Sequence, residues 1–203
     1  MPVVSGSNAS ELAEALAIEL GWQHHPLEVR RFPDSEGYVR VPQESIDAIR
    51  GEPVVVVATT FPDSGIVEAL LMLESIYDVR SGDMSNLKGE GEQKLEHAGP
   101  GIFLAVPYFG YSRQDKRFQR GEVVSAKLLA RLLTRRCDGM VVLDLHAPAV
   151  LDDLDVPVSF VSSMPEIAIH LQQLVKPDFV LSPDKGAIER ASHVAKAIGC
   201  NFS

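Results

Sequence analysis

Short apolar runs alternate along the chain with longer stretches in which apolar residues recur every three or four positions. The apolar runs predict buried strands at residues 54–58, 102–106, 140–143, 156–161 and 179–181. The longer stretches predict helices at residues 10–20, 65–77, 125–136 and 186–198, and one that ends at Leu174. In the first helix we expect Leu12, Ala15 and Leu16 on one face and Gly21 as the stop. Strands that alternate with helices predict an α/β fold with a parallel sheet covered on both faces.

Two polar stretches interrupt this alternation. Residues 80–101 are rich in Gly and are expected to form an exposed excursion. Residues 107–122 (PYFGYSRQDKRFQRGE) form a long loop between a predicted strand and a predicted helix. Loops of this length inside compact domains are usually functional or disordered, so this one is a candidate for the functional site.

The second of these loops carries the strongest chemical signal. Four of the chain's 19 basic residues, including Arg113, Lys116 and Arg117, lie within eight consecutive positions of this loop. Arginine's planar guanidinium suits phosphate oxygens and lysine adds a point charge, so the cluster is typical of a polyphosphate site. A solvated loop whose charges pair internally with Asp115 and Glu122 accounts for the same residues, and composition does not separate the two interpretations.

Composition and charge narrow the classes of partner. The formal net charge is -9 and the pI is about 5.1, which disfavours attraction of the whole chain to DNA, RNA or anionic lipid. Any bound anion must therefore meet a local cluster of positive charge. Cys137 and Cys200 form no C-x-x-C or zinc spacing. No apolar run approaches the ~20 residues of a membrane span, and the N-terminus lacks an export signal, so we expect a cytoplasmic protein with no nucleic-acid or membrane partner.

Polar side chains also follow two of the predicted strands. Asp144 and His146 point to the same side of a strand because side chains alternate, and Asp184 stands where a strand meets a helix. In open parallel sheets, ligands bind beyond the carboxyl ends of the strands. His146 and Asp184 are therefore candidates for holding Mg²⁺ together with phosphate oxygens and water. The alternatives are a hydrogen-bonded core histidine for His146 and a helix N-cap for Asp184.

A third segment, residues 30–40 (RRFPDSEGYVR), places Asp34 and Glu36 in a turn between extended stretches. The ring of Phe32 is available for stacking, but taken alone the pattern is typical of a surface hairpin. The chain contains no P-loop motif G-x-x-x-x-G-K-[ST] and no G-x-G-x-x-G after a strand. A nucleotide bound by this chain would therefore occupy neither an ordinary P-loop nor a Rossmann site.

Five segments, in this order, resemble the ribose-phosphate diphosphokinase (phosphoribosyl diphosphate synthetase) family. They are SGSNASELAEAL, RRFPDSEGYVRV, VPYFGYSRQDKRFQRGEVVSAKLLARLL, VVLDLHAPAVLDDLDVPV and LSPDKGAIERA. The resemblance implies two phosphoribosyltransferase-type α/β domains with parallel sheets flanked by helices, an N-terminal ATP-binding one at 1–138 and a partial C-terminal one at 139–203. It also implies a homo-oligomer that uses Mg²⁺ and transfers diphosphate from ATP to ribose 5-phosphate.

The resemblance assigns roles by position. The residues that resemble the family's adenine loop, which in this family lies across a subunit interface, are Phe32, Asp34 and Glu36. Those that resemble its ATP-binding loop are Arg113, Gln114, Asp115, Lys116 and Arg117. Those that resemble its metal and phosphate pair are His146 and Asp184.

The sequence departs from the family pattern at three places. Ser35 and Ala187 stand where the family usually has Gly. The family continues past the position of Ser203 into a mobile loop with catalytic Lys and Arg, and into the loop that holds ribose 5-phosphate. We therefore expect an incomplete second domain and no diphosphate transfer by this chain alone. Two hypotheses fit: a diphosphokinase, and a catalytically silent homologue that binds and regulates an active synthetase.

Overall fold

A computed structural model describes residues 1–84, 99–175 and 177–203 of the chain. These residues form two compact units, Met1–Phe160 and Val161–Ser203. Most of the excursion expected at residues 80–101 lies outside the described residues. Within the described part, no helix is both long enough and apolar enough to cross a membrane.

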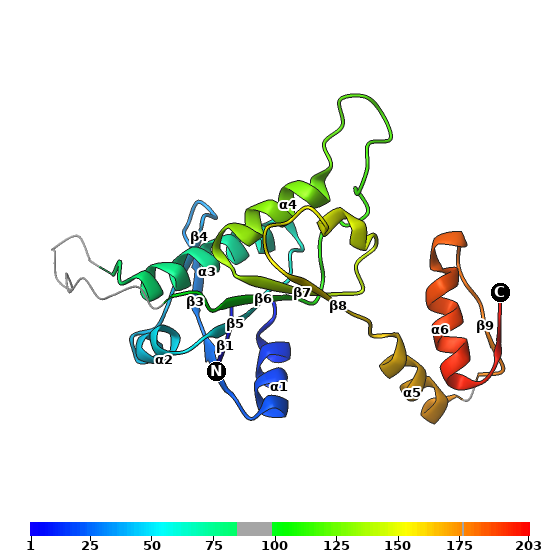
Figure 1. Ribbon diagram of the computed structural model, residues 1–203. Helices are drawn as coiled ribbons and strands as arrows, with labels where there is room; N and C mark the ends of the chain where they lie inside the picture. The colour runs from blue at the N-terminus through cyan, green and yellow to red at the C-terminus, as the bar shows by residue number, and fades with distance from the viewer. Residues whose placement is uncertain (85–98, 176) are drawn as a thin grey trace. The chain divides into compact units, whose positions relative to one another are not determined.

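A six-stranded sheet forms the centre of the first unit (Figure 1). Its strands are β1 (Pro2–Ser5), β2 (Gln23–Pro26), β5 (Val54–Val57), β6 (Ile102–Val106), β7 (Gly139–Leu143) and β8 (Val158–Val161), in the order β2-β1-β5-β6-β7-β8. All pairs from β2 to β7 are parallel. The predicted α/β fold with a parallel sheet is confirmed, and the continuous apolar runs form strands β5, β6 and β7. Helices cover both faces at β5, whereas Phe103 of β6 and Val141 of β7 are 38% and 40% exposed.

Helices lie on both faces of this sheet. In Figure 1, α1 (Ser10–Leu20) covers one face, and α3 (Asp63–Ser81) and α4 (Ser125–Leu133) cover the other. Side chains alternate along a strand, so Val3 and Val57 pack in the cluster with α1 while Val4 and Val56 pack in the cluster with α3 and α4. The remaining helical segments of this unit are η1 (Gln43–Ser45), α2 (Ile46–Gly51), η2 (Thr134–Arg136) and η3 (Pro148–Leu151).

The first helix has the expected length, but of the three residues expected on one face only Leu16 packs against the core. It runs from Ser10 to Leu20 and stops at Gly21, whose φ of 66° is in the left-handed region. Ala13 and Ala17 are buried against the sheet, whereas Leu12 is 48% exposed. The small alanine side chains let the helix lie close to β1 and β5. The helix therefore buries its alanines against the sheet and leaves the larger Leu12 at the surface.

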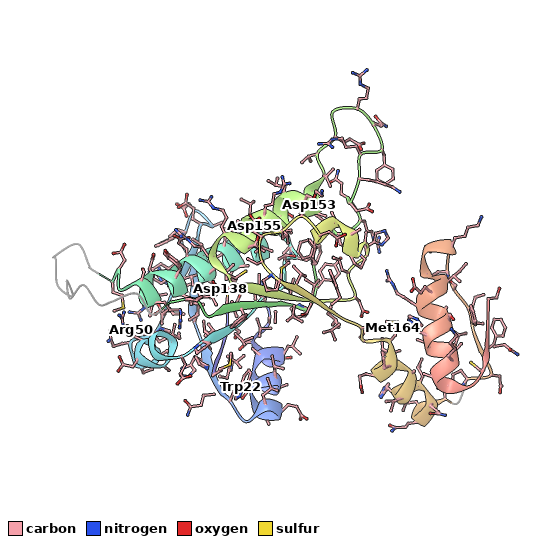
Figure 2. The ribbon with its side chains drawn as sticks, viewed as in Figure 1. Trp22, Arg50, Asp138, Asp153, Asp155 and Met164 are labelled. Atoms are coloured by element: carbon pink, nitrogen blue, oxygen red, sulfur yellow. The ribbon has the colours of Figure 1, made fainter. Side chains whose placement is uncertain are left out.

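The first compact unit extends past residue 138, where we expected the first domain to end. Strand β7 follows that position and pairs with β6 from Phe103↔Gly139 to Val106↔Val142. Asp138, labelled at the start of β7 in Figure 2, accepts hydrogen bonds from the Gly101 and Ile102 amides at 2.6 and 2.9 Å. These bonds align the starts of the two strands and keep β7 in the first sheet.

The second unit is small. It contains α5 (Met164–Leu174), β9 (Phe179–Val180), η4 (Lys185–Ala187), α6 (Ile188–Ile198) and β10 (Asn201–Phe202). Strands β9 and β10 pair in parallel, and α5 packs against α6. The predicted strand at 179–181 and the predicted helix at 186–198 are therefore present, each slightly shorter than expected.

Two half-buried histidines on β2 predict that the fold loses stability in mild acid. A nitrogen of His24 lies 2.8 Å from the Ser5 hydroxyl, and a nitrogen of His25 lies 3.0 Å from that of Ser45. Burial is the main cause that lowers the pKa of each imidazole below its ordinary 6.5. The unfolded chain therefore binds these protons at higher pH than the folded chain. The stability they contribute is complete above 6.5 and is lost as the pH falls through the folded pKa values.

The measurement is the midpoint of thermal unfolding between about pH 7.5 and about pH 5.5. We expect the midpoint of the wild type to fall over this range, and that of the double variant H24Q/H25Q to fall less. Parallel curves for the two proteins would show that these imidazoles do not couple folding to pH.

Candidate functional site

The carboxyl ends of β1, β5, β6 and β7 meet at one edge of the sheet because these strands are parallel. The segments that follow the strands are joined by hydrogen bonds. The Asn8 side-chain amide donates to the carbonyl of Thr59 at 3.2 Å, and the Thr60 amide donates to the carbonyl of Tyr108 at 3.1 Å. This edge is where an open parallel sheet offers a binding site.

A buried carboxylate holds the loop that follows β1. Glu68 of α3 is 7% exposed and accepts hydrogen bonds from the Ser7 amide at 2.6 Å and the Ser7 hydroxyl at 2.7 Å. A side chain at Gly6 would place its Cβ 2.2 Å from Glu68 Oε1, so any larger residue here would displace the Glu68 carboxylate from the loop. The loop after β1 is thereby tied to α3, and Glu68 is a residue that the helical pattern alone does not single out.

The basic loop, residues 107–122, leaves β6 and runs to the start of α4; in Figure 1 it projects from the first unit above α4. The side chains of Arg113, Lys116 and Arg117 are exposed. Within residues 1–84, 99–175 and 177–203, no carboxylate forms an ion pair with any of these three. The alternative interpretation, in which the cations pair with Asp115 and Glu122 inside the loop, is therefore not supported for these three residues.

Glu122 organises the far side of the basic loop through the main chain. Its carboxylate accepts hydrogen bonds from the Phe118 and Gln119 amides at 2.7 and 3.0 Å, and its carbonyl accepts one from Arg117 Nε at 2.8 Å. Lys116 Nζ lies 5.4 Å from the centre of the Phe118 ring. Glu122 thus holds the main chain of the loop in place, and its carboxylate forms no ion pair with Arg113, Lys116 or Arg117.

Gln114 and Asp115 are half-buried at the base of the same loop. The Ser125 hydroxyl donates to Gln114 Oε1, and the Ala126 amide donates to the Gln114 carbonyl at 3.4 Å. These contacts fasten the loop to the first turn of α4. The side-chain oxygen of Gln114 is thus used within the protein, while its predicted role as an ATP-binding residue stays a prediction.

Tyr111 sits in a strained conformation next to the cations. Its φ of 60° is in the left-handed region, which costs a non-glycine residue roughly 1–2 kcal/mol. Its hydroxyl donates to Asp63 Oδ1 at 2.8 Å, and this hydrogen bond is the main cause that raises the pKa of the phenol. Strain of this kind persists only where neighbouring contacts enforce it, so the turn that leads to Arg113 is held from outside the loop.

The segment at 30–40 forms the expected hairpin. Strands β3 (Glu28–Arg31) and β4 (Gly37–Arg40) pair antiparallel, and β4 packs on α3. Phe32 is 39% exposed and meets Tyr38 edge-to-face at 5.8 Å, with the Arg30 guanidinium over both rings. The hairpin therefore presents an aromatic ring and a cation at its surface.

The hairpin turn explains one departure from the family pattern. Ser35 has a φ of 74°, which glycine adopts without strain and serine does not. The Glu36 amide donates to Asp34 Oδ1 at 3.1 Å, and Arg31 donates to the Ser35 carbonyl at 2.9 Å. These contacts keep the turn closed with serine in place, and all three predicted residues of this loop, Phe32, Asp34 and Glu36, are exposed.

His146 and Asp184 belong to different units, so whether they form a pair stays a prediction. His146 is exposed just beyond β7, which argues against a core histidine. Asp184 is the N-cap of η4, where its Oδ1 accepts from the Ala187 amide at 3.0 Å. Among the described residues, no three or more His, Cys, Asp or Glu side chains are arranged to hold a metal ion.

Comparison with known proteins identifies the family. A family model described as the N-terminal domain of ribose phosphate pyrophosphokinase matches residues 1–82 and 96–136, more than half of the chain. The chain belongs to the ribose phosphate pyrophosphokinase N-terminal domain family. The matched region includes the hairpin, the buried glutamate Glu68 and the whole basic loop, whereas His146 and Asp184 lie outside it.

Individual relatives of this family extend the match to the whole chain. A ribose-phosphate pyrophosphokinase of Methanothermobacter thermautotrophicus is 37% identical over 200 residues, and one of Sulfurisphaera tokodaii is 32% identical over 206 residues. The matches cover 98% and 100% of this chain but only 62% and 63% of the relatives. The chain therefore spans slightly less than two thirds of the length of these pyrophosphokinases.

A solved structure supports the fold. The crystal structure of phosphoribosylpyrophosphate synthetase from Mycobacterium smegmatis matches with a TM-score of 0.74 at 24% sequence identity. The match covers 99% of this chain and 62% of that one. The α/β fold is thus shared over nearly all of the chain.

Sequence reasoning missed three residues of this site: Thr60, Glu68 and Tyr111. Thr60 carried a usable signal, because a polar pair, Thr59-Thr60, directly follows a buried apolar strand. Glu68 and Tyr111 carried none, since each acts through a partner far away in the sequence.

Proposed function

We propose that this chain provides the ATP-binding part of a ribose-phosphate diphosphokinase, an enzyme that transfers diphosphate from ATP to ribose 5-phosphate. The products are 5-phosphoribosyl 1-diphosphate and AMP. One observation carries the proposal: in a member of the ribose phosphate pyrophosphokinase family, three exposed cations without ion-pair partners in the described residues stand in the loop that leaves the carboxyl end of β6.

The chemistry of the transfer suits these residues. Transfer at phosphorus needs positioning and neutralisation of charge more than it needs a protein nucleophile. Arg113 and Arg117 would bind phosphate oxygens through their guanidinium groups, and Lys116 would add a point charge. Because the whole chain carries a net charge of -9, a polyphosphate needs a local cluster of positive charge, and this loop provides one.

The hairpin would contribute the adenine contacts. Phe32 offers an exposed ring, and Asp34 and Glu36 offer carboxylates at the same turn. We propose that these residues serve the nucleotide of a second copy of the chain, so that the active form is a homo-oligomer in the cytoplasm. The exposure of Phe32, Asp34 and Glu36 supports this proposal, since a neighbouring copy could contact all three.

Mg²⁺ is the cofactor that the proposed reaction would use. Mg²⁺ prefers oxygen ligands and keeps several waters, usually with one or two carboxylates and the substrate phosphates. We propose Asp184 as the source of a carboxylate oxygen and the exposed imidazole of His146 as a group that would hold a water of the ion. When bound, the ion supplies positive charge that offsets the negative charge of the transferred phosphates.

Substitution of Arg113 tests the proposal. We expect Arg113→Ala to weaken binding of ATP with Mg²⁺ by about tenfold, because a charged hydrogen-bond donor to phosphate is lost. Titration calorimetry on the purified chain gives the affinity directly. The matched control is Arg135→Ala, which removes the same charge from η2 at the other end of α4 and should leave the affinity unchanged.

Two results would contradict the proposal. Equal affinities for the wild type and Arg113→Ala would exclude the basic loop as the phosphate site. A wild-type chain that does not bind ATP at millimolar concentration would exclude the nucleotide-binding role altogether.

A further inference from the structure

Thr60 lies in the interior beneath the start of the basic loop. It follows β5, is 1% exposed, and lies in a segment that is neither strand nor helix. Its hydroxyl accepts a hydrogen bond from the Gly110 amide at 2.6 Å and donates one to the Tyr108 carbonyl at 3.2 Å. Its own amide donates to the same carbonyl at 3.1 Å. One buried threonine therefore bonds to both Tyr108 and Gly110, the residues at which the loop leaves the sheet.

The approach between the two segments is unusually close. A side chain at Gly110 would place its Cβ 2.2 Å from the Thr60 carbonyl oxygen and 3.4 Å from the Thr60 hydroxyl. Only glycine permits this contact without a shift of the backbone. The Gly110 amide is buried at this point, so the Thr60 hydroxyl is the partner that satisfies it.

Two residues, Tyr111 and Ser112, separate Gly110 from Arg113, the first cation of the loop. Tyr111 follows Gly110 in its left-handed conformation, the Gln114 amide donates to the Tyr111 carbonyl at 2.9 Å, and Arg113 lies inside that turn. Gln114 in turn is fastened to α4 through Ser125. The turn that carries Arg113 is thus fixed at two ends, by Thr60 on the β5 side and by Gln114 on the α4 side.

We propose that Thr60 is a positioning residue for the nucleotide phosphates, acting through the Gly110 amide on the placement of Arg113 and Lys116. This inference rests on the proposed function of the basic loop. Thr60 itself does not reach the substrate, since it is buried; it sets the direction in which the exposed cations leave the sheet. Loss of its hydroxyl would leave the Gly110 amide without its partner and free the loop to move.

Three variants separate positioning from a general effect on stability. Thr60→Val keeps the shape of the side chain and removes the hydroxyl, whereas Thr60→Ser keeps the hydroxyl and removes a methyl group. Thr134→Val removes a hydroxyl that bonds to the Ala130 carbonyl at 2.9 Å, at the end of α4 remote from the loop. It therefore controls for the loss of a threonine hydrogen bond as such.

Two measurements on the full chain give the outcome. In calorimetry with ATP and Mg²⁺, we expect Thr60→Val to bind about tenfold more weakly than the wild type, and Thr60→Ser and Thr134→Val to stay within about twofold. In limited trypsin digestion followed by mass spectrometry, we expect cleavage after Arg113, Lys116 and Arg117 to be several-fold faster in Thr60→Val alone.

The outcomes distinguish the inference from the function on which it rests. Equal ATP affinity and equal cleavage of Thr60→Val and the wild type would overturn the positioning role while leaving the ATP site intact. Equal weakening in Thr60→Val and Thr134→Val would also overturn it, because stability alone would then explain the effect. A wild type that binds no ATP would overturn the proposed function, and the digestion would still decide whether Thr60 holds the loop.

Discussion

Replacement of Arg80 with methionine is expected to lower the free energy of unfolding by about 3 kcal/mol, the largest effect on stability that we expect from any one side chain. Arg80, near the end of α3, is 2% exposed. Its guanidinium donates to the Ile49 carbonyl at 2.9 Å and to that of Glu52, which joins α3 to the end of α2. It also donates to the carbonyls of Gly99 and Pro100 at 3.2 and 3.4 Å, just before β6.

The size of the expected effect follows from the burial of the donor and of the Ile49 contact. Methionine fills most of the volume of the arginine stem but leaves four main-chain carbonyls without this donor, and a buried group left unsatisfied, as at Ile49, costs about 1–3 kcal/mol before relaxation. The charged form of Arg80 is already disfavoured at this position. Burial is the main cause that lowers the pKa of Arg80, and repulsion by Arg50, labelled in Figure 2, lowers it further. Arg80 Nε has no hydrogen-bond partner in the described part of the chain.

Urea unfolding followed by fluorescence of Trp22 or by circular dichroism would measure the loss. Arg131→Ala is the matched control, because it removes the same charge from the exposed surface of α4 and should change the stability by less than about 0.5 kcal/mol. If Arg80→Met unfolds at the urea concentration of the control, the four carbonyl contacts contribute nothing to stability.

Local pattern predicted the strands at the centre of this fold because their residues are continuously apolar. Val54–Val57 and Ile102–Val106 are apolar without interruption, a composition typical of strands in a covered parallel sheet. The short strand at Gln23–Pro26 escaped prediction because it stands at the edge of the sheet and carries two histidines. The buried face of the first helix escaped because the spacing of Leu12 and Leu16 outweighed the small alanines that contact the sheet.

The candidate site divides in the same way. Its cations were visible from sequence because Arg113, Lys116 and Arg117 are close together in an acidic chain. The contact that holds them was not visible, although Thr60 itself follows a predicted strand, because Thr60 is 50 residues from Gly110 in sequence and bonds to it only once β5 and β6 lie side by side. Charge can be read from composition, whereas the support of a loop depends on contacts between strands.

Substitution of Gly110 with alanine should have the largest effect on the loop itself. The new Cβ would lie 2.2 Å from the Thr60 carbonyl oxygen, and that oxygen belongs to the backbone and cannot rotate away. Either β5 or the start of the loop must move, which costs about 1–3 kcal/mol of stability as in other overpacked sites. The movement would displace Arg113, so we also expect binding of ATP to weaken by more than about tenfold.

Gly51→Ala provides the matched control for this prediction. A Cβ at Gly51 meets nothing within 4 Å, and the residue ends α2, where alanine is tolerated better than glycine. Its stability and ATP affinity should therefore equal or slightly exceed those of the wild type. If Gly110→Ala behaves like Gly51→Ala in both measurements, the close approach of Gly110 to Thr60 does not constrain the loop, and the cations must be placed by their contacts with α4 alone.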